Sequence, residues 1–345
     1  MAVITYLEAT SSMNPFTAAL PLLLLLLLPQ DFQAVAADDS LVRDTCMRAA
    51  NVSIGHVDFE SCVEALQSDP ATPGATDARG LALISANLTL TNVTRTIYLT
   101  ETWVQYMNLC QGIYTDMSAN VTDAMRTLEA GDLAGAVRKM DWAAIQPNEC
   151  DLVMFQGDGS SDWGANPLSY QDNYAAFLSS TALAILRSMS VITADDSLVR
   201  DTCMRAANDS HVDFESCVEA LESDPATAGP TDVRGLALIS ANLTLTNLTR
   251  TIYLAKTWVH YLTLCQKIYT DMSANVTDAI RTLEAGDLAG AVSKMDWAAM
   301  QPSECDLLMF QGDGSSDWGA NPLSHQDNYA ALLAFTALAI LRSLN

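Results

Sequence analysis

Apolar residues return every three or four positions along most of the chain, which is the spacing of one face of an α-helix. The first such stretch spans 76–99, starts at the cap pair Thr76-Asp77 and contains neither Gly nor Pro after Gly80. Its predicted buried stripe consists of Leu81, Ile84, Leu88 and Thr91. The pattern therefore predicts an amphipathic helix over 76–99.

Three more stretches have the same periodicity, at 102–129, 132–155 and 169–187, and Pro147 is expected to interrupt the middle one. Their stripes contain Tyr106, Cys110, Ile113, Met117, Val121 and Leu128, then Leu133, Val137, Met140 and Ala144, then Tyr174, Leu178, Thr181 and Ile185. Four amphipathic helices with short links predict an antiparallel four-helix bundle. The residues before 76 would form a hairpin appended to it.

The whole pattern occurs twice. The stretch ADDSLVRDTCMRAAN occupies 37–51 and 194–208, and 37–189 align with 194–344 with one gap at Ile54-Gly55. Because this period is far longer than the units of solenoid proteins, each copy is interpreted as a whole domain. The predicted fold is all-α, with two tandem antiparallel four-helix bundles, each with an N-terminal helical hairpin and two disulfides. The expected domains are 38–189 and 195–345, joined by a linker at 190–194.

Each copy contains an even number of cysteines, which in an exported chain indicates disulfides. They are Cys46, Cys62, Cys110 and Cys150 in the first copy and Cys203, Cys217, Cys265 and Cys305 in the second. If Ala130-Gly131-Asp132 is a turn between antiparallel helices, Cys110 and Cys150 both lie about 30 Å from it and meet. The remaining pair would then close the N-terminal hairpin.

Two features predict export. Residues 18–28 read AALPLLLLLLL, a run too short to span a bilayer, and Ala34-Val35-Ala36 matches a signal-peptide cleavage pattern. Residues 1–36 are therefore expected to be a signal peptide. The chain also carries Asn-x-Ser/Thr acceptors for N-glycosylation. They begin at Asn51, Asn87, Asn92, Asn120, Asn208, Asn242, Asn247 and Asn275.

The charge of the chain narrows the choice of partner. With 17 Lys and Arg against 41 Asp and Glu, the formal net charge is −24. Nucleic acids and anionic lipid surfaces should be repelled, and no membrane association is expected after signal cleavage. A basic protein is the partner that this charge favours.

The sequence offers no set of residues typical of catalysis. Of the histidines, only His56 and His211 occupy equivalent positions in the two copies, and both are expected in a solvated hairpin loop. The stretch from Asp158 to Asp162 resembles a calcium loop but has Trp163 where the loop needs Gly. No phosphate-binding glycine loop or nucleophile elbow occurs. We therefore predict no catalytic, cofactor or metal site and a protein that is not an enzyme.

An ordered set of motifs runs through both copies: LVRDTC, DFESCVEAL, RGLALISANL, the LCQ and IYTDM stretch, KMDWAA, ECD and the ALAIL ending. Together they cover nearly all of 38–344. This set resembles the plant invertase/pectin methylesterase inhibitor family, and most of all its pollen-type members. The resemblance implies a hairpin of short helices on a bundle, with bridges Cys46–Cys62 and Cys110–Cys150.

The resemblance also implies a function. It predicts a secreted protein of the apoplast or cell wall that binds a cell-wall carbohydrate enzyme one-to-one and occludes its substrate cleft with bundle-helix surfaces. The expected partner is a basic pectin methylesterase or an acid invertase. The alternative is a non-inhibitory secreted protein of the pollen surface or of storage. A small secreted enzyme is disfavoured because no catalytic set is found.

Candidate contact residues come from the positions at which the copies differ most, 100–112 and 177–180. They are Gln105, Asn108 and Gly112 in the first copy and their counterparts His260, Thr263 and Lys267 in the second. The functional interpretation is that these residues set which enzyme each copy binds. The alternative interpretation is drift at an exposed helix end.

Overall fold

The structure is a computed structural model that describes residues 39–53, 56–155, 166–189, 198–209, 212–228, 232–310 and 321–344. Every regular element in these ranges is helical. The signal peptide, the linker, His211 and the calcium-loop-like stretch expected from the sequence lie outside them.

The helices of the two copies correspond one to one. Those of the first copy are α2 (Asp39–Val52), α3 (Phe59–Gln67), η1 (Thr72–Gly74), α4 (Ala78–Glu129), α5 (Leu133–Phe155) and α6 (Ser169–Ser188). Those of the second are α7 (Leu198–Asp209), α8 (Phe214–Glu222), η2 (Pro225–Ala228), α9 (Val233–Glu284), α10 (Leu288–Phe310) and α11 (Ser324–Ser343). The expected all-helical class is confirmed, and α5 runs through Pro147 instead of being interrupted there.

The largest departure from expectation is α4, a single helix of 52 residues. The prediction of one helix ending near residue 99 and another starting at Thr102 was wrong. The join contains neither Gly nor Pro, and its threonines bond back along the helix, since the Thr100 hydroxyl donates to the Thr96 carbonyl at 2.6 Å. By contrast Gly131, which follows α4, has a φ of +89° and does reverse the chain. The same difference holds in α9, where Gly286 makes the turn.

The buried face of α4 explains why the helix continues. Most of its buried positions from Ala82 to Leu128 follow one another at alternating steps of four and three residues, with Ser85 and Leu99 buried beside this stripe. The stripe consists of Ala82, Ala86, Thr89, Val93, Thr96, Thr100, Trp103, Met107, Cys110, Tyr114, Met117, Val121, Ala124 and Leu128. This is an unbroken heptad pattern, which favours long helices that supercoil around each other. In its N-terminal part the stripe consists mostly of Ala and Thr. Of the predicted stripe Leu81, Ile84, Leu88 and Thr91, the first is buried, the next two are half-buried and Thr91 is exposed.

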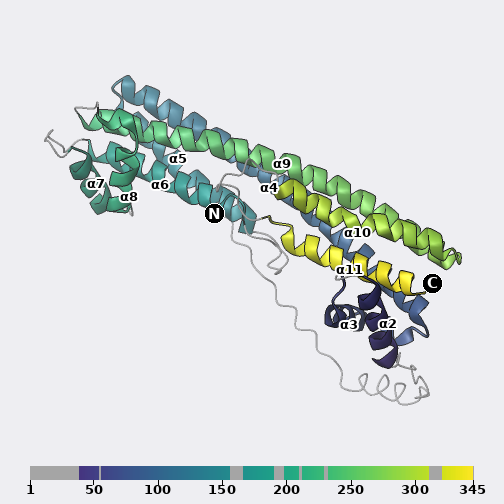
Figure 1. Cartoon of the computed structure of the whole chain (residues 1–345). Coiled ribbons are helices and arrows are strands. Elements are labelled where there is room, and N and C mark those ends of the chain that lie inside the picture. The colour runs from purple at the N-terminus through teal and green to yellow at the C-terminus, as the bar shows by residue number, and fades with distance from the viewer. Residues whose placement is uncertain are drawn as a thin grey trace, which may run out of the picture.

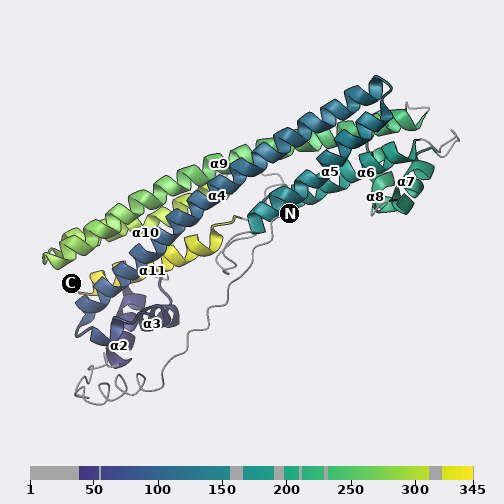
Figure 2. The same ribbon diagram turned by 180° about the vertical axis from the view of Figure 1, so that it is seen from behind.

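The two long helices pair with each other and bring the two copies together. α4 and α9 lie antiparallel along their whole length (Figures 1 and 2). The C-terminal part of α4 and the N-terminal part of α9 form one four-helix bundle with α5 and α6, on which the hairpin α7–α8 packs. We name it the α5–α6 bundle. The other parts of α4 and α9 form the α10–α11 bundle with α10, α11 and the hairpin α2–α3.

Each bundle is therefore assembled from both copies, whereas the sequence predicted that each copy closes its own. Two direct contacts show that helices are exchanged between the copies. The hydroxyl of Ser85 on α4 donates to the carbonyl of Leu333 on α11 at 3.4 Å. His56, between α2 and α3, stacks on Phe335 with ring centroids 4.7 Å apart. The physical reason is the missing turn signal near residue 100, because a straight α4 directs its two ends to different bundles.

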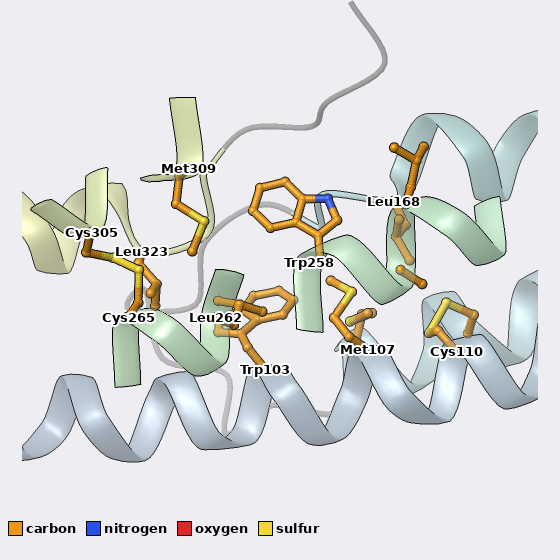
Figure 3. Close-up of a cluster of buried hydrophobic side chains, with 14 of the residues drawn as sticks. Trp103, Met107, Cys110, Leu168, Trp258, Leu262, Cys265, Cys305, Met309 and Leu323 are labelled. Atoms are coloured by element: carbon orange, nitrogen blue, oxygen red, sulfur yellow. A yellow bond between two sulfur atoms is a disulfide. The ribbon is translucent and has the colours of Figure 1, made fainter. Parts of the chain in front are cut away.

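The middle of the molecule is a shared core. Trp103 of α4 and Trp258 of α9 are 2% and 1% exposed. Figure 3 shows them in one cluster with Met107 and Leu262, between the Cys110–Cys150 and Cys265–Cys305 disulfides. Because both copies contribute large side chains here, the two bundles share one continuous hydrophobic core.

The cysteines pair as geometry and the family resemblance predict. The bonds are Cys46–Cys62, Cys110–Cys150, Cys203–Cys217 and Cys265–Cys305. Each of them joins residues of the same copy, so no disulfide crosses from one copy to the other. The exchange of helices is held by non-covalent contacts alone.

Two arginines link the ends of the long helices reciprocally. The guanidinium of Arg79, in the first turn of α4, donates to the carbonyls of Leu283 and Glu284 at the end of α9. Arg234 of α9 donates to the carbonyls of Leu128 and Glu129 at 2.9 and 2.8 Å. The last carbonyls of a helix have no partner within the helix, so each arginine caps the helix of the other copy.

We expect the double variant Arg79→Ala/Arg234→Ala to unfold about 2 to 4 kcal/mol more easily, because each guanidinium makes charge-assisted hydrogen bonds to two carbonyls at a helix end. Urea denaturation followed by circular dichroism measures this. The matched control is Arg126→Ala/Arg281→Ala, which removes two exposed arginines from the same helix ends. The control should cost less than about 1 kcal/mol. Equal losses in the two double variants would contradict the capping role.

Candidate partner-binding surface

The candidate contact residues form two exposed ridges. Gln105, Asn108 and Gly112 are exposed on one face of α4, and the Cβ position of Gly112 faces open space. The second ridge lies on α9 and consists of His260, Thr263 and Lys267, which are also exposed. Each ridge begins two residues after the buried tryptophan of its helix.

The ridges differ in charge, although they occupy equivalent positions. The α4 ridge carries no ionisable group, whereas Lys267 and His260 make the α9 ridge the more basic of the two. On α4 the Asn108 amide donates to the Val104 carbonyl at 2.9 Å, which holds the side chain along the helix. The structure therefore places the predicted residues where a partner can reach them, on one rigid helix each.

The other variable stretch, 177–180, lies where the last helix of one copy meets the hairpin of the other. Phe177 belongs to a row of rings on α6, in which Tyr170 and Tyr174 are 6.1 Å apart and Tyr174 and Phe177 6.2 Å apart. In the second copy the equivalent positions are His325, Tyr329 and Leu332. The stacking of His56 on Phe335 is a further difference, because the counterpart of Phe335 is Ser180.

The ring row lines a groove of about 580 Å³ between α6 and α8. Its opposite wall is formed by Ser216, Glu219 and Ala220 of α8 and by Ser223, which follows that helix. The pKa of Tyr174 is raised, first by burial and then by the nearby Tyr170 and Glu219. Aromatic faces beside a carboxylate attract cations, so the groove fits a Lys or Arg side chain of a binding partner. Sequence reasoning missed this groove because its walls come from different copies.

A second set of residues missed from the sequence is buried. The hydroxyl of Tyr114 donates to Asp172, whose other carboxylate oxygen accepts from the Asn166 amide at 2.8 Å. Asn166 also donates to Asp151 at 3.1 Å. The second copy repeats this network with Tyr269, Asp327, Asn321 and Asp306.

The environment of Asp172 favours its protonated form. Burial raises the pKa of Asp172 to about 7, against the hydrogen bonds from Tyr114 and Asn166, which lower it. Burial also raises the pKa of Tyr114 well above its ordinary value. Asp327 behaves in the same way, with a pKa of about 7. Asp172 is 3% exposed, so it contacts its neighbours and not a substrate, and the network joins the start of α6 to α4.

The described residues show neither a group of metal-ligating side chains nor a membrane-spanning helix. Within the described ranges, no three His, Cys, Asp or Glu side chains are grouped so as to hold a metal ion. His56, His260 and His325 lie on different elements and are exposed. Among the helices that the structure describes, none is both long and apolar enough to cross a membrane.

The predicted glycosylation acceptors differ in exposure. Asn51, Asn87, Asn208 and Asn242 are exposed, whereas the other four are half-buried. The side-chain oxygens of Asn92 and Asn247 are buried without a hydrogen bond. Asn120 and Asn275 donate to Gln146 and Gln301 at 3.3 and 3.5 Å.

Comparison of the chain with protein-family models, with curated proteins and with solved structures found no match in any of the three.

Proposed function

We propose that this protein is a secreted inhibitor that binds a cell-wall carbohydrate enzyme, either a basic pectin methylesterase or an acid invertase. The proposal starts from the sequence resemblance to the plant invertase/pectin methylesterase inhibitor family. The all-helical class and the cysteine pairing that this resemblance implies agree with the structure. The target, the extracellular location and the inhibition itself are parts of the proposal.

The observation that supports this function most directly is the groove between α6 and α8. It combines three stacked rings with Glu219, in a chain whose net charge is −24. A basic partner would insert a Lys or Arg side chain over Tyr170 and Tyr174, and the charge of the whole chain would accelerate the encounter. The ridge Gln105, Asn108 and Gly112 supplies a second rigid contact. Because the hairpin and the ring row come from different copies, this inhibitory surface needs the complete chain.

We expect the complete chain to inhibit one of the two enzymes when mixed with it at mildly acidic pH. The variants Tyr170→Ala and Glu219→Gln should weaken inhibition about tenfold or more, as loss of a central contact does. Tyr170 is 65% exposed, so its removal should leave the fold intact.

The second copy offers the matched controls. His325→Ala and Glu64→Gln change the equivalent positions of the other bundle, where Leu332 replaces the ring of Phe177 and His325 replaces Tyr170. Equal weakening by both pairs of variants would show that the groove between α6 and α8 is not the contact. If neither enzyme loses activity with the wild-type chain, the protein is a non-inhibitory secreted protein and the proposal is wrong.

A further inference from the structure

An exposed tryptophan recurs at the same position of both copies. Trp142 on α5 is 63% exposed, and Trp297 on α10 is 69% exposed. The other tryptophans of the described ranges, Trp103 and Trp258, are buried in the shared core. A large apolar ring that faces water at the same position of both copies offers a flat surface on which another apolar face can pack.

A glycosylation acceptor lies beside each of these rings. Trp142 lines a depression of about 580 Å³ between α4 and α5, and Asn120 of the sequence Asn-Val-Thr lines the same depression. The Asn120 amide nitrogen is 3.3 Å from the side-chain oxygen of Gln146, which is one helical turn beyond Trp142. In the second copy Asn275 and Gln301 are 3.5 Å apart in the same relation to Trp297.

We infer that Asn120 and Asn275 carry N-linked glycans whose first sugar, N-acetylglucosamine, lies on the ring of Trp142 or Trp297. The C–H face of a pyranose is apolar and can pack flat on an indole. Arg138 and Lys139 line the same depression and supply donors for the sugar's oxygens. The inference rests on the proposed export through the secretory pathway and not on inhibition.

The donor of the glycan is a lipid pyrophosphate-linked oligosaccharide, which the secretory pathway supplies as the co-reactant. The Asn120 amide nitrogen forms a bond to the anomeric carbon of the sugar, and the bond from that carbon to the lipid pyrophosphate breaks. One amide hydrogen leaves as a proton, and no group is oxidised or reduced. The second amide hydrogen remains for the bond to Gln146, so the contact that directs the side chain toward Trp142 survives.

The test uses the full chain secreted from a eukaryotic host, with glycopeptides mapped by mass spectrometry. The folded protein is then exposed to hydroxyl radicals, and oxidation of each tryptophan is measured. In Asn120→Gln, oxidation of Trp142 should rise several-fold while that of Trp297 stays unchanged. Asn275→Gln should give the reverse result. Enzymatic removal of the glycans from the folded wild-type chain should expose both rings without any substitution.

The matched control is Asn87→Gln, which removes an exposed acceptor on the part of α4 that belongs to the other bundle. It should change the oxidation of neither ring. The inference fails if Asn87 is glycosylated and Asn120 is not, or if Trp142 oxidises equally with and without its glycan. A chain without any glycan overturns the inference together with the proposed export, whereas an inhibition assay on the same material tests the proposed function separately.

Discussion

Cutting the chain between Met189 and Leu198 will leave the two fragments bound to each other as one particle. No disulfide joins the copies, so two self-contained domains would separate after such a cut. In the structure, α4 and α9 instead pair along 52 residues each. Separation would expose the shared core around Trp103 and Trp258, and each large side chain of that core contributes about 2 to 3 kcal/mol on burial.

The measurement is size-exclusion chromatography with light scattering, before and after cleavage at a protease site inserted between the copies. The cut protein should keep the mass of the uncut chain. A particle of half that mass would show that each copy closes its own bundle.

A zero-length cross-link separates the exchanged arrangement from two self-closed domains that merely adhere. In the structure the side chain of Arg79 lies at the end of α9, beside Glu284. In a self-closed first copy it would lie at the end of its own second helix, beside Glu129. In the variant Arg79→Lys, carbodiimide should therefore join the introduced lysine to Glu284 and link the two fragments covalently. A link to Glu129 within one fragment would refute the exchange.

Arrangements of this kind are intramolecular relatives of domain swapping, in which identical elements trade places without loss of contacts. The two copies are nearly identical in sequence, so α11 can accept the N-terminal part of α4 almost as it would accept that of α9. What decides between the two arrangements is the join near residue 100. A turn there would need to break the hydrogen bond from Thr100 to Thr96 and unpack Leu99, which is 3% exposed.

The sequence does indicate that the helix continues through the join near residue 100, although the expectation of four separate helices pointed to a break there. Turn signals are present at Gly131 and Gly286 and absent at 99–102. The heptad pattern also keeps its phase from Thr96 through Thr100 to Trp103, which two separate helices would have no reason to do. The Ala and Thr residues of this heptad pattern are only weakly apolar. The predicted stripe was therefore based on the larger side chains Ile84 and Leu88, which lie on a different face of the helix.

The candidate surface was predictable only where a single helix carries it. Gln105, Asn108 and Gly112 follow helical spacing, and their exposure could be inferred from the buried residues between them. The groove between α6 and α8 could not, because Tyr174 and Glu219 belong to different copies and meet only after the exchange. The Tyr114–Asp172 pair is separated by 58 residues, and its one signal is that both residues recur unchanged as Tyr269 and Asp327.

Stability should fall as the pH rises from about 5 to about 8 because of these buried pairs. The pKa of Asp172 is about 7 in the folded chain, and that of Asp327 is the same. An unfolded aspartate has a pKa of about 3.9. Between these values the folded chain holds protons that the unfolded chain releases, so a higher pH favours unfolding. The stabilisation is complete below about pH 4 and is lost as the pH passes 7, on the order of 4 kcal/mol for each carboxyl group, of which about 2 to 3 kcal/mol is lost above pH 5.

The double variant Asp172→Asn/Asp327→Asn should flatten this dependence, since an amide keeps the shape of a protonated carboxyl and does not ionise. The Tyr114 hydroxyl can accept a hydrogen bond as well as donate one, so the amide can pair with both Tyr114 and Asn166. The variant should be close to the wild type near pH 5 and more stable near pH 8 in urea titrations. The control Asp116→Asn/Asp271→Asn removes the same two charges from exposed positions of α4 and α9 and should keep the wild-type slope. If the Asp172→Asn/Asp327→Asn variant kept that slope too, the pH response would come from the general repulsion of an acidic chain and not from the buried carboxyl groups.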